Sequence, residues 1–140
     1  VEDVDRSKVL TAQNIMVPAI TTNIEIDGPN VALQRMRKEE VSMLLAIDRK
    51  RQLKGSLTAE SAQEARAKGL TLKEVIDKNV QKVHKDTLIS DLFNLIHDSP
   101  APLAVIDDED RLLGVVIRGS VIGALTDTKA KEESEVNANA

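Results

Sequence analysis

The chain of 140 residues contains no cysteine, no tryptophan and no tyrosine, and its only aromatic residue is Phe93. Without cysteine there is no disulfide scaffold, no thiolate zinc site and no cysteine nucleophile. With a single aromatic side chain, the chain lacks the platforms on which most single-strand and RNA binders stack bases. The net charge of −4 argues against binding to duplex DNA. We therefore expect no nucleic-acid partner, and the composition favours a binding module over an enzyme.

Long hydrophobic runs are also missing. The longest fall far short of the roughly 20 apolar residues that a membrane-spanning helix needs, so we expect no such helix. The sequence begins at Val1 and shows no signal-peptide pattern, and we expect it to be a segment of a longer polypeptide. Residues 128–140 are small, polar and acidic, which predicts a flexible tail.

What the chain does contain is an internal repeat at an offset of about sixty residues. Its first copy holds Ile47-Asp48 followed by Leu53-Lys54-Gly55, and its second holds Ile106-Asp107 followed by Leu112-Leu113-Gly114. In both copies an aspartate follows an apolar run, and a Leu-x-Gly pattern follows a polar turn. We therefore divide the chain into two copies of one unit, over residues 9–69 and 70–127.

Each copy predicts the same order of elements: a short strand, a helix, two strands joined by a polar turn, and a second helix. Apolar residues at helical spacing predict the first helices at residues 31–40 and 88–96. In the latter, one face carries Leu88, Leu92, Leu95 and Ile96. Uninterrupted apolar runs predict strands buried on both faces, each continuing into a hairpin. The hairpin strands are predicted at residues 43–47, 53–58, 103–106 and 112–117. Thr58 and Gly69 are the expected start and end of the helix after the first hairpin.

The predicted fold class is α/β (α+β), with two βαββα repeats packed on their sheets in a pseudo-twofold arrangement, because neither copy alone can bury both faces of its sheet. A tandem unit with these motifs resembles a pair of cystathionine-β-synthase (CBS) domains, a Bateman module. Residues 4–16 and the stretch Val116-Ile117-Arg118-Gly119-Ser120 are similar to the CBS pair at the C-terminus of the ATPase subunit of glycine betaine (osmoprotectant) ABC importers.

The resemblance implies a regulatory role with no catalytic residue in this segment. Residues 1–8 would link the pair to a preceding ATPase domain, and ATP would bind only on that domain. The implied partners are a second copy of the CBS pair, forming a homodimer, together with the ATPase domain and the membrane subunit of the importer. The implied location is the cytoplasmic face of the cell membrane.

The resemblance also implies a set of regulatory ligands. CBS pairs often bind adenosine nucleotides, through a Gly-h-x-Thr-x-x-Asp pattern whose aspartate holds the ribose hydroxyls. Here both copies end in serine, at Ser61 and Ser120, and Ile117 replaces the threonine in the second copy. This argues against AMP or ATP in the ordinary mode. The family implies two other signals: cyclic di-AMP bound at a dimer interface, which holds transport off, and ionic strength sensed through anionic lipid.

Arg118 is the leading candidate for contact with a phosphodiester. It follows an apolar strand and opens a helix, where an arginine and a helix N-terminus together suit a phosphate. Gly119 beside it would allow close approach of the backbone. By resemblance, an adenine would be held by aliphatic neighbours. These candidates are Ile20, Ser42, Pro102, Val115 and Ile117. The alternative is that Arg118 is an ordinary surface arginine and that the others belong to the core.

The same hairpin turn carries opposite charges in the two copies, Arg49-Lys50-Arg51 in the first and Asp108-Glu109-Asp110 in the second. The first copy adds further cations, namely Arg35, Arg37, Lys38 and Lys54. This basic group could face anionic lipid, and salt screening would make such an attraction a gauge of ionic strength. The acidic turn could instead meet the basic turn of a second subunit. The alternative is that both turns are simply solvated.

No metal site or catalytic constellation is predicted. His84 and His97 have no carboxylate partners at metal-ligand spacing, and we expect both to be structural. Two other functions stay open: a structural dimerisation module without a ligand, and an adenosine-nucleotide-sensing CBS pair of another protein.

Overall fold

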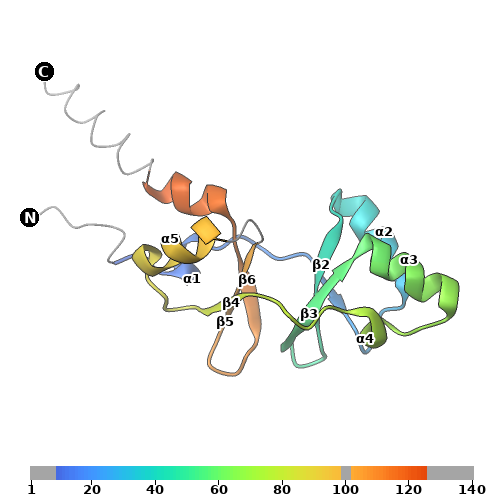
Figure 1. Cartoon of the computed structure of the whole chain (residues 1–140). Coiled ribbons are helices and arrows are strands. Elements are labelled where there is room, and N and C mark those ends of the chain that lie inside the picture. The colour runs from blue at the N-terminus through green and yellow to red at the C-terminus, as the bar shows by residue number, and fades with distance from the viewer. Residues whose placement is uncertain (1–8, 99–101, 126–140) are drawn as a thin grey trace, which may run out of the picture. The chain divides into compact units, whose positions relative to one another are not determined.

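The computed structural model describes residues 9–98 and 102–125. The predicted linker at residues 1–8 and the predicted tail at residues 128–140 lie outside the described residues. Two three-stranded sheets organise the chain, each with its strands in sequence order (Figure 1). Their strands are β1 (Thr21–Asn23), β2 (Met43–Ile47) and β3 (Leu53–Thr58) in one sheet, and β4 (Lys82–His84), β5 (Leu103–Ile106) and β6 (Leu112–Val116) in the other. Strand β1 runs parallel to β2, and β2 runs antiparallel to β3.

Helices flank these sheets. They are α1 (Ala12–Ile15), α2 (Pro29–Glu39), α3 (Ala59–Lys68), α4 (Leu72–Val75) and α5 (Ile89–Asp98), and residues 118–125 are also helical. Helices α2 and α3 pack against each other and against the first sheet (Figure 1). The mixed α/β class and the order of elements in each copy are therefore confirmed. Within the described residues no helix has the length and apolar character needed to cross a membrane.

Several local predictions are confirmed by the geometry. The central strands β2 and β5 are buried along almost their whole length, as their uninterrupted apolar runs indicate. The Thr58 side chain accepts a hydrogen bond from the Ser61 N–H at 3.1 Å, as an N-cap should. Gly69 ends α3 in the left-handed conformation, with φ of 67°. Helix α2 begins at Pro29, two residues before the apolar pattern at residues 31–40, since proline suits the first turn of a helix.

The predicted face of α5 needs one correction. Leu92 and Ile96 are buried, but Leu95 is 37% exposed. Ile89, which is fully buried, completes the inward stripe together with these two residues. Because this stripe is centred between Ile89 and Ile96, the helical period places Leu95 at its margin. Leu95 therefore contributes to the surface of the helix rather than to the core.

Two short helices were not predicted. Helix α1 follows Thr11, whose N–H donates to the Asn14 side chain at 2.9 Å. Helix α4 follows Thr71, whose N–H donates to the Glu74 carboxylate at 2.7 Å. Threonine followed three residues later by a side-chain acceptor is the capping-box pattern. That pattern was the available signal for both helices.

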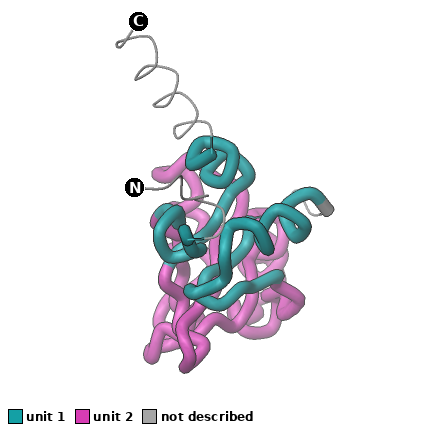
Figure 2. Tube along the Cα trace, turned by 90° about the vertical axis from the view of Figure 1, so that its left-hand side faces the viewer, with its two compact units in different colours: residues 1–17, 81–105, 114–140 teal, residues 18–80, 106–113 magenta. Residues whose placement is uncertain are grey.

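The chain forms two compact units that differ from the sequence repeats (Figure 2). One unit includes the described parts of residues 1–17, 81–105 and 114–140, and the other consists of residues 18–80 and 106–113. Residues 9–17 of the first copy thus pack with the second, and residues 70–80 of the second pack with the first.

Backbone pairs hold each exchanged segment in place. Val17 and Val115 exchange two hydrogen bonds in one unit, at 2.8 and 2.9 Å. Ser56 and Asp77 exchange two in the other unit, at the same two distances. The core of that second unit contains Leu72, from the exchanged segment, against Leu44 and Leu57. Each repeat therefore pairs a residue of its last strand with the opening segment of the other repeat, and in the unit of residues 18–80 and 106–113 that segment also enters the core.

Candidate functional site

Five of the seven predicted ligand-binding residues lie in the unit that contains β4, β5 and α5. Pro102 directly precedes β5, Val115 lies on β6, and Ile117 follows the end of β6. Arg118 and Gly119 open the helix at residues 118–125. The other two, Ile20 and Ser42, lie in the other unit, where they precede β1 and β2.

The Arg118 guanidinium lies at the C-terminal end of α5. Its Nη2 donates to the Ile96 carbonyl oxygen at 3.5 Å. The C-terminal end of a helix carries partial negative charge, which favours a cation at this position. The long bond occupies one of the five N–H donors of the guanidinium, so donors remain for a ligand.

Arg118 also lines an open hollow of about 290 Å³ between α5 and the helix at residues 118–125. The other lining residues are Phe93, Ile96, His97, Val121 and Ile122. Phe93 is 43% exposed and Ile122 is 51% exposed, so two large exposed apolar side chains line the same hollow. The hollow therefore joins one guanidinium to an exposed apolar wall, an arrangement that can receive a phosphate ester attached to an apolar ring.

The sequence analysis named Arg118, which lines this hollow, but missed the other residues of its walls. Phe93, Ile96 and His97 have helical spacing and bring their side chains to one side of α5. The sequence did contain a signal for these walls. Helix α5 carries Phe93 and Leu95 in addition to its buried residues, which is more apolar residues than one buried face needs. The single aromatic residue of the chain thus lines the hollow instead of filling the core.

Most of the predicted basic group is engaged within the fold. Arg35 forms an ion pair with Asp27 at 2.8 Å, and Arg49 and Lys54 form longer ones, at 3.7 Å, with Glu25 and Asp48. Arg51 donates from Nη2 to the Leu112 carbonyl at 3.4 Å. In the described part of the chain, the exposed side chains of Arg37, Lys38 and Lys50 make no ion pair. These three are the members of the group whose charge faces only solvent.

The basic and acidic hairpin turns lie side by side in one unit. The Leu53 N–H donates to the Asp110 carbonyl at 3.0 Å, and the Leu112 N–H donates to the Arg51 carbonyl at 2.9 Å. Arg51 and Asp110 occupy equivalent positions and both have positive φ, 64° and 62°. A contact between these turns from two subunits was one of the possibilities in the sequence, and here the two turns are hydrogen-bonded to each other within one chain.

An aspartate holds each of these turns. Burial raises the pKa of Asp48, but hydrogen bonds from the Gln52 and Lys50 backbone N–H groups outweigh it and leave the pKa below its ordinary value. Asp107, at the equivalent position, has a lowered pKa for the same reasons. In its case the hydrogen bonds come from the N–H groups of Arg111 and Glu109 and from the Arg111 side chain. Both carboxylates therefore stabilise the turns in their ionised form.

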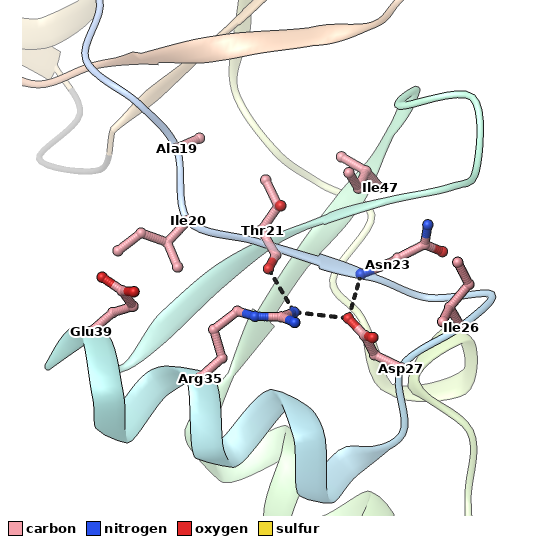
Figure 3. A pocket seen from close by; sticks show the side chains of 9 residues that line it. All are labelled: Ala19, Ile20, Thr21, Asn23, Ile26, Asp27, Arg35, Glu39 and Ile47. Carbon is pink, nitrogen blue, oxygen red and sulfur yellow. Dashed lines mark hydrogen bonds and ion pairs between the residues drawn. The ribbon is translucent and has the colours of Figure 1, made fainter.

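A second hollow, of about 470 Å³, follows the open edge of β1 (Figure 3). There Asp27 Oδ2 accepts three hydrogen bonds, from the Thr22 hydroxyl at 3.0 Å, the Asn23 N–H at 2.9 Å and Arg35 Nη1 at 2.8 Å. Burial raises the pKa of Asp27, but these bonds outweigh it and hold the pKa below its ordinary value. Across the described residues, no group of three or more His, Cys, Asp and Glu side chains could hold a metal ion.

Comparison with known proteins gives consistent matches. Residues 72–127 match the family model of the CBS domain. The chain is 39% identical over 125 residues to the glycine betaine transport ATP-binding protein OpuAA of Bacillus subtilis, a match that covers 89% of this chain and 30% of that protein. It is 38% identical over 141 residues to the glycine betaine/carnitine transport ATP-binding protein GbuA of Listeria monocytogenes, covering 100% of this chain and 34% of the relative. The chain thus spans about a third of the length of these relatives.

Solved structures give the same fold. Staphylococcus aureus OpuCA matches with a TM-score of 0.73 and 25% identity, over 81% of this chain and 97% of that chain. CbpB in complex with c-di-AMP matches with a TM-score of 0.68 and 15% identity, over 89% of this chain and 85% of that chain.

Proposed function

This chain belongs to the CBS domain family, and from that premise we propose that it is a regulatory module of an osmoprotectant ABC importer. The support comes from its similarity to glycine betaine and carnitine transport ATP-binding proteins. On this proposal its partners are an ATPase domain in the same polypeptide and the membrane subunit of the importer, at the cytoplasmic face of the membrane. The module itself carries no step of ATP hydrolysis.

The signal is proposed to be cyclic di-AMP, bound between two copies of the chain. The observation that carries this proposal is the position of Arg118 at an open apolar hollow. Cyclic di-AMP has two phosphodiesters and two adenines related by a twofold axis. An isologous pair of chains would supply one Arg118 for each phosphate and one apolar wall for each base. The charge-assisted, bidentate geometry of arginine suits a phosphodiester better than a lysine would.

The exposed side chains around the hollow support a homodimer. Phe93, Ile117 and Ile122 are all more than 40% exposed on this unit. A second copy and a ligand would remove this apolar surface from water, which is favourable. Ligand binding would then favour one conformation of the importer, to the extent that the affinity differs between its two states.

Isothermal titration calorimetry with cyclic di-AMP tests the proposal. We expect saturable binding to the wild-type chain and at least a tenfold weaker affinity in Arg118→Ala, because a charged hydrogen bond to phosphate contributes about 1.5–3 kcal/mol. Arg66→Ala is the matched control, since Arg66 is an exposed arginine of α3 in the other unit. An absence of binding to the wild type would refute the proposed ligand. A dimer that forms equally well without ligand would then favour a purely structural module.

A further inference from the structure

The hollow at the edge of β1 presents two opposite charges side by side. Arg35 and Glu39 lie one helical turn apart on α2, and both line the hollow (Figure 3). Residues at this spacing have Cβ atoms about 5–6 Å apart. The hollow lies wholly within the unit of residues 18–80 and 106–113, apart from the unit that contains Arg118.

The guanidinium of Arg35 is fixed before any ligand arrives. Its Nη1 donates to the Thr21 carbonyl at 3.0 Å and to Asp27 Oδ2 at 2.8 Å. These contacts use one nitrogen of the fork, so donors on the other nitrogens remain for an anion. The Arg35 side chain is 35% exposed, so these donors are within reach of a ligand from solvent. A group held in this way loses little conformational entropy when it binds.

Glu39 supplies the opposite charge. Its side chain is exposed and makes no hydrogen bond or ion pair within the described part of the chain. Asp27, the other acid in the hollow, is already paired with Arg35. The carboxylate of Glu39 is therefore available to a cation, while Arg35 is available to an anion on the same ligand.

The remaining walls decide which cation fits. Ile20, Ile26 and Ile47 face the hollow and offer no hydrogen-bond acceptor (Figure 3). Of the three N–H donors of a primary ammonium, those that face Glu39 would keep an acceptor, but those that face these side chains would lose their hydrogen bonds to water. A quaternary ammonium has no N–H donor to leave unpaired, and its methyl groups can contact isoleucine.

We infer that this hollow binds a small zwitterion with an alkylated ammonium, its carboxylate on Arg35 and its ammonium beside Glu39. This inference deepens the proposed function, and its biological role rests on that function. The regulatory module would then respond to a solute as well as to a nucleotide. The binding chemistry does not depend on cyclic di-AMP.

Amide chemical shifts in an NMR titration with glycine betaine test this inference. We expect saturable shifts confined to the hollow, at Ile20, Thr21 and Asn23. Glycine, which keeps its N–H donors, and choline, which lacks the carboxylate, should both bind more weakly. Sucrose is the solute control, because osmolytes excluded from the protein surface act on the whole protein without a site.

Substitution of Glu39 is the more specific test of this inference. Glu39→Gln should weaken glycine betaine about threefold to fivefold, the effect of losing a partly exposed charge contact. Glu40→Gln is the matched control, because it removes the same charge one residue away and Glu40 does not line the hollow. Shifts that do not saturate, or equal binding by both variants, would overturn the inference. Either result leaves cyclic di-AMP binding at Arg118 to be decided separately, since Arg118 lies in the other unit.

Discussion

The backbones of Val17 and Val115, almost a hundred residues apart in sequence, pair directly: each N–H donates to the other's carbonyl, at 2.8 and 2.9 Å. Gly114 precedes Val115, and a Cβ at Gly114 would lie 2.7 Å from the Val17 carbonyl oxygen. In the other repeat a Cβ at Gly55 would overlap the Asp77 carbonyl oxygen. At the glycine of the Leu-x-Gly pattern, the exchanged segment therefore comes too close to the strand to leave room for a side chain.

Gly114→Ala should lower the free energy of unfolding by about 1–3 kcal/mol, because the added methyl pushes the paired segments apart. Gly55→Ala should do the same in the other unit. Gly123→Ala is the control, since within the described residues a Cβ there would meet nothing within 4 Å outside its own helix, and alanine is favoured in a helix. Urea unfolding followed by circular dichroism measures all three. Equal stability of Gly114→Ala and the wild type would contradict the close approach.

These glycines also separate the features that could be predicted from the sequence from those that could not. The repeat, the central strands and the cap at Thr58 were predicted because each depends on local pattern: apolar runs, turn residues and capping chemistry. The exchange of opening segments was not predicted, because backbone hydrogen bonds such as Val17–Val115 leave no trace in side-chain pattern. The Leu-x-Gly pattern was visible in the sequence. Why it requires glycine is clear only from the structure, where the Val17 and Asp77 carbonyls approach Gly114 and Gly55.

In the candidate site, too, some residues could be named from the sequence and others could not. Arg118 could be named as a candidate because a residue between a strand and a helix has a definable position in sequence. The walls of its hollow were missed because Phe93 and Ile122 come from different helices, whose packing sequence periodicity does not give. The ion pairs of the basic group were missed for a related reason. Its ion pair between Arg35 and Asp27 depends on how the β1 edge meets α2, which the sequence does not specify.

Thr58→Ala should cost about 1 kcal/mol of stability, because the Ser61 N–H in the first turn of α3 loses its acceptor. Thr58→Ser keeps a hydroxyl at the same position and serves as the matched control. The midpoint of urea unfolding distinguishes the two variants. If both lower the midpoint equally, the methyl group of Thr58 rather than the cap accounts for the loss.

The stability of the protein should fall as the solution becomes acidic, in part through Asp27. Its folded pKa lies below the ordinary value of 3.8, so the ionised carboxylate contributes stability above that value. This contribution is lost as the pH falls through the folded pKa. Asp27→Asn should lower stability at neutral pH by about 1–3 kcal/mol and flatten the decline below about pH 4. Thermal unfolding across this range measures both effects, and parallel curves for variant and wild type would show that Asp27 does not contribute.

If the chain also responds to anionic membranes, the response should come from the members of the basic group that form no ion pair within the described residues. Combined neutralisation of Arg37, Lys38 and Lys50 to Gln should reduce co-sedimentation with phosphatidylserine vesicles at low salt, because each basic residue near such a surface contributes about 1 kcal/mol. Neutralising Arg66, Lys73 and Lys78 changes the net charge equally and is the control. Binding that is insensitive to salt, or lost equally in both triple variants, would exclude a local charge sensor.

The most direct test of the central claim is the stoichiometry of cyclic di-AMP binding, measured by calorimetry with the chain well above the dissociation constant. A ligand held by one Arg118 from each of two chains requires one cyclic di-AMP per two chains, with a dimer at saturation in analytical ultracentrifugation. One ligand per chain on a monomer, or an unchanged titration in Arg118→Ala, would contradict the claim.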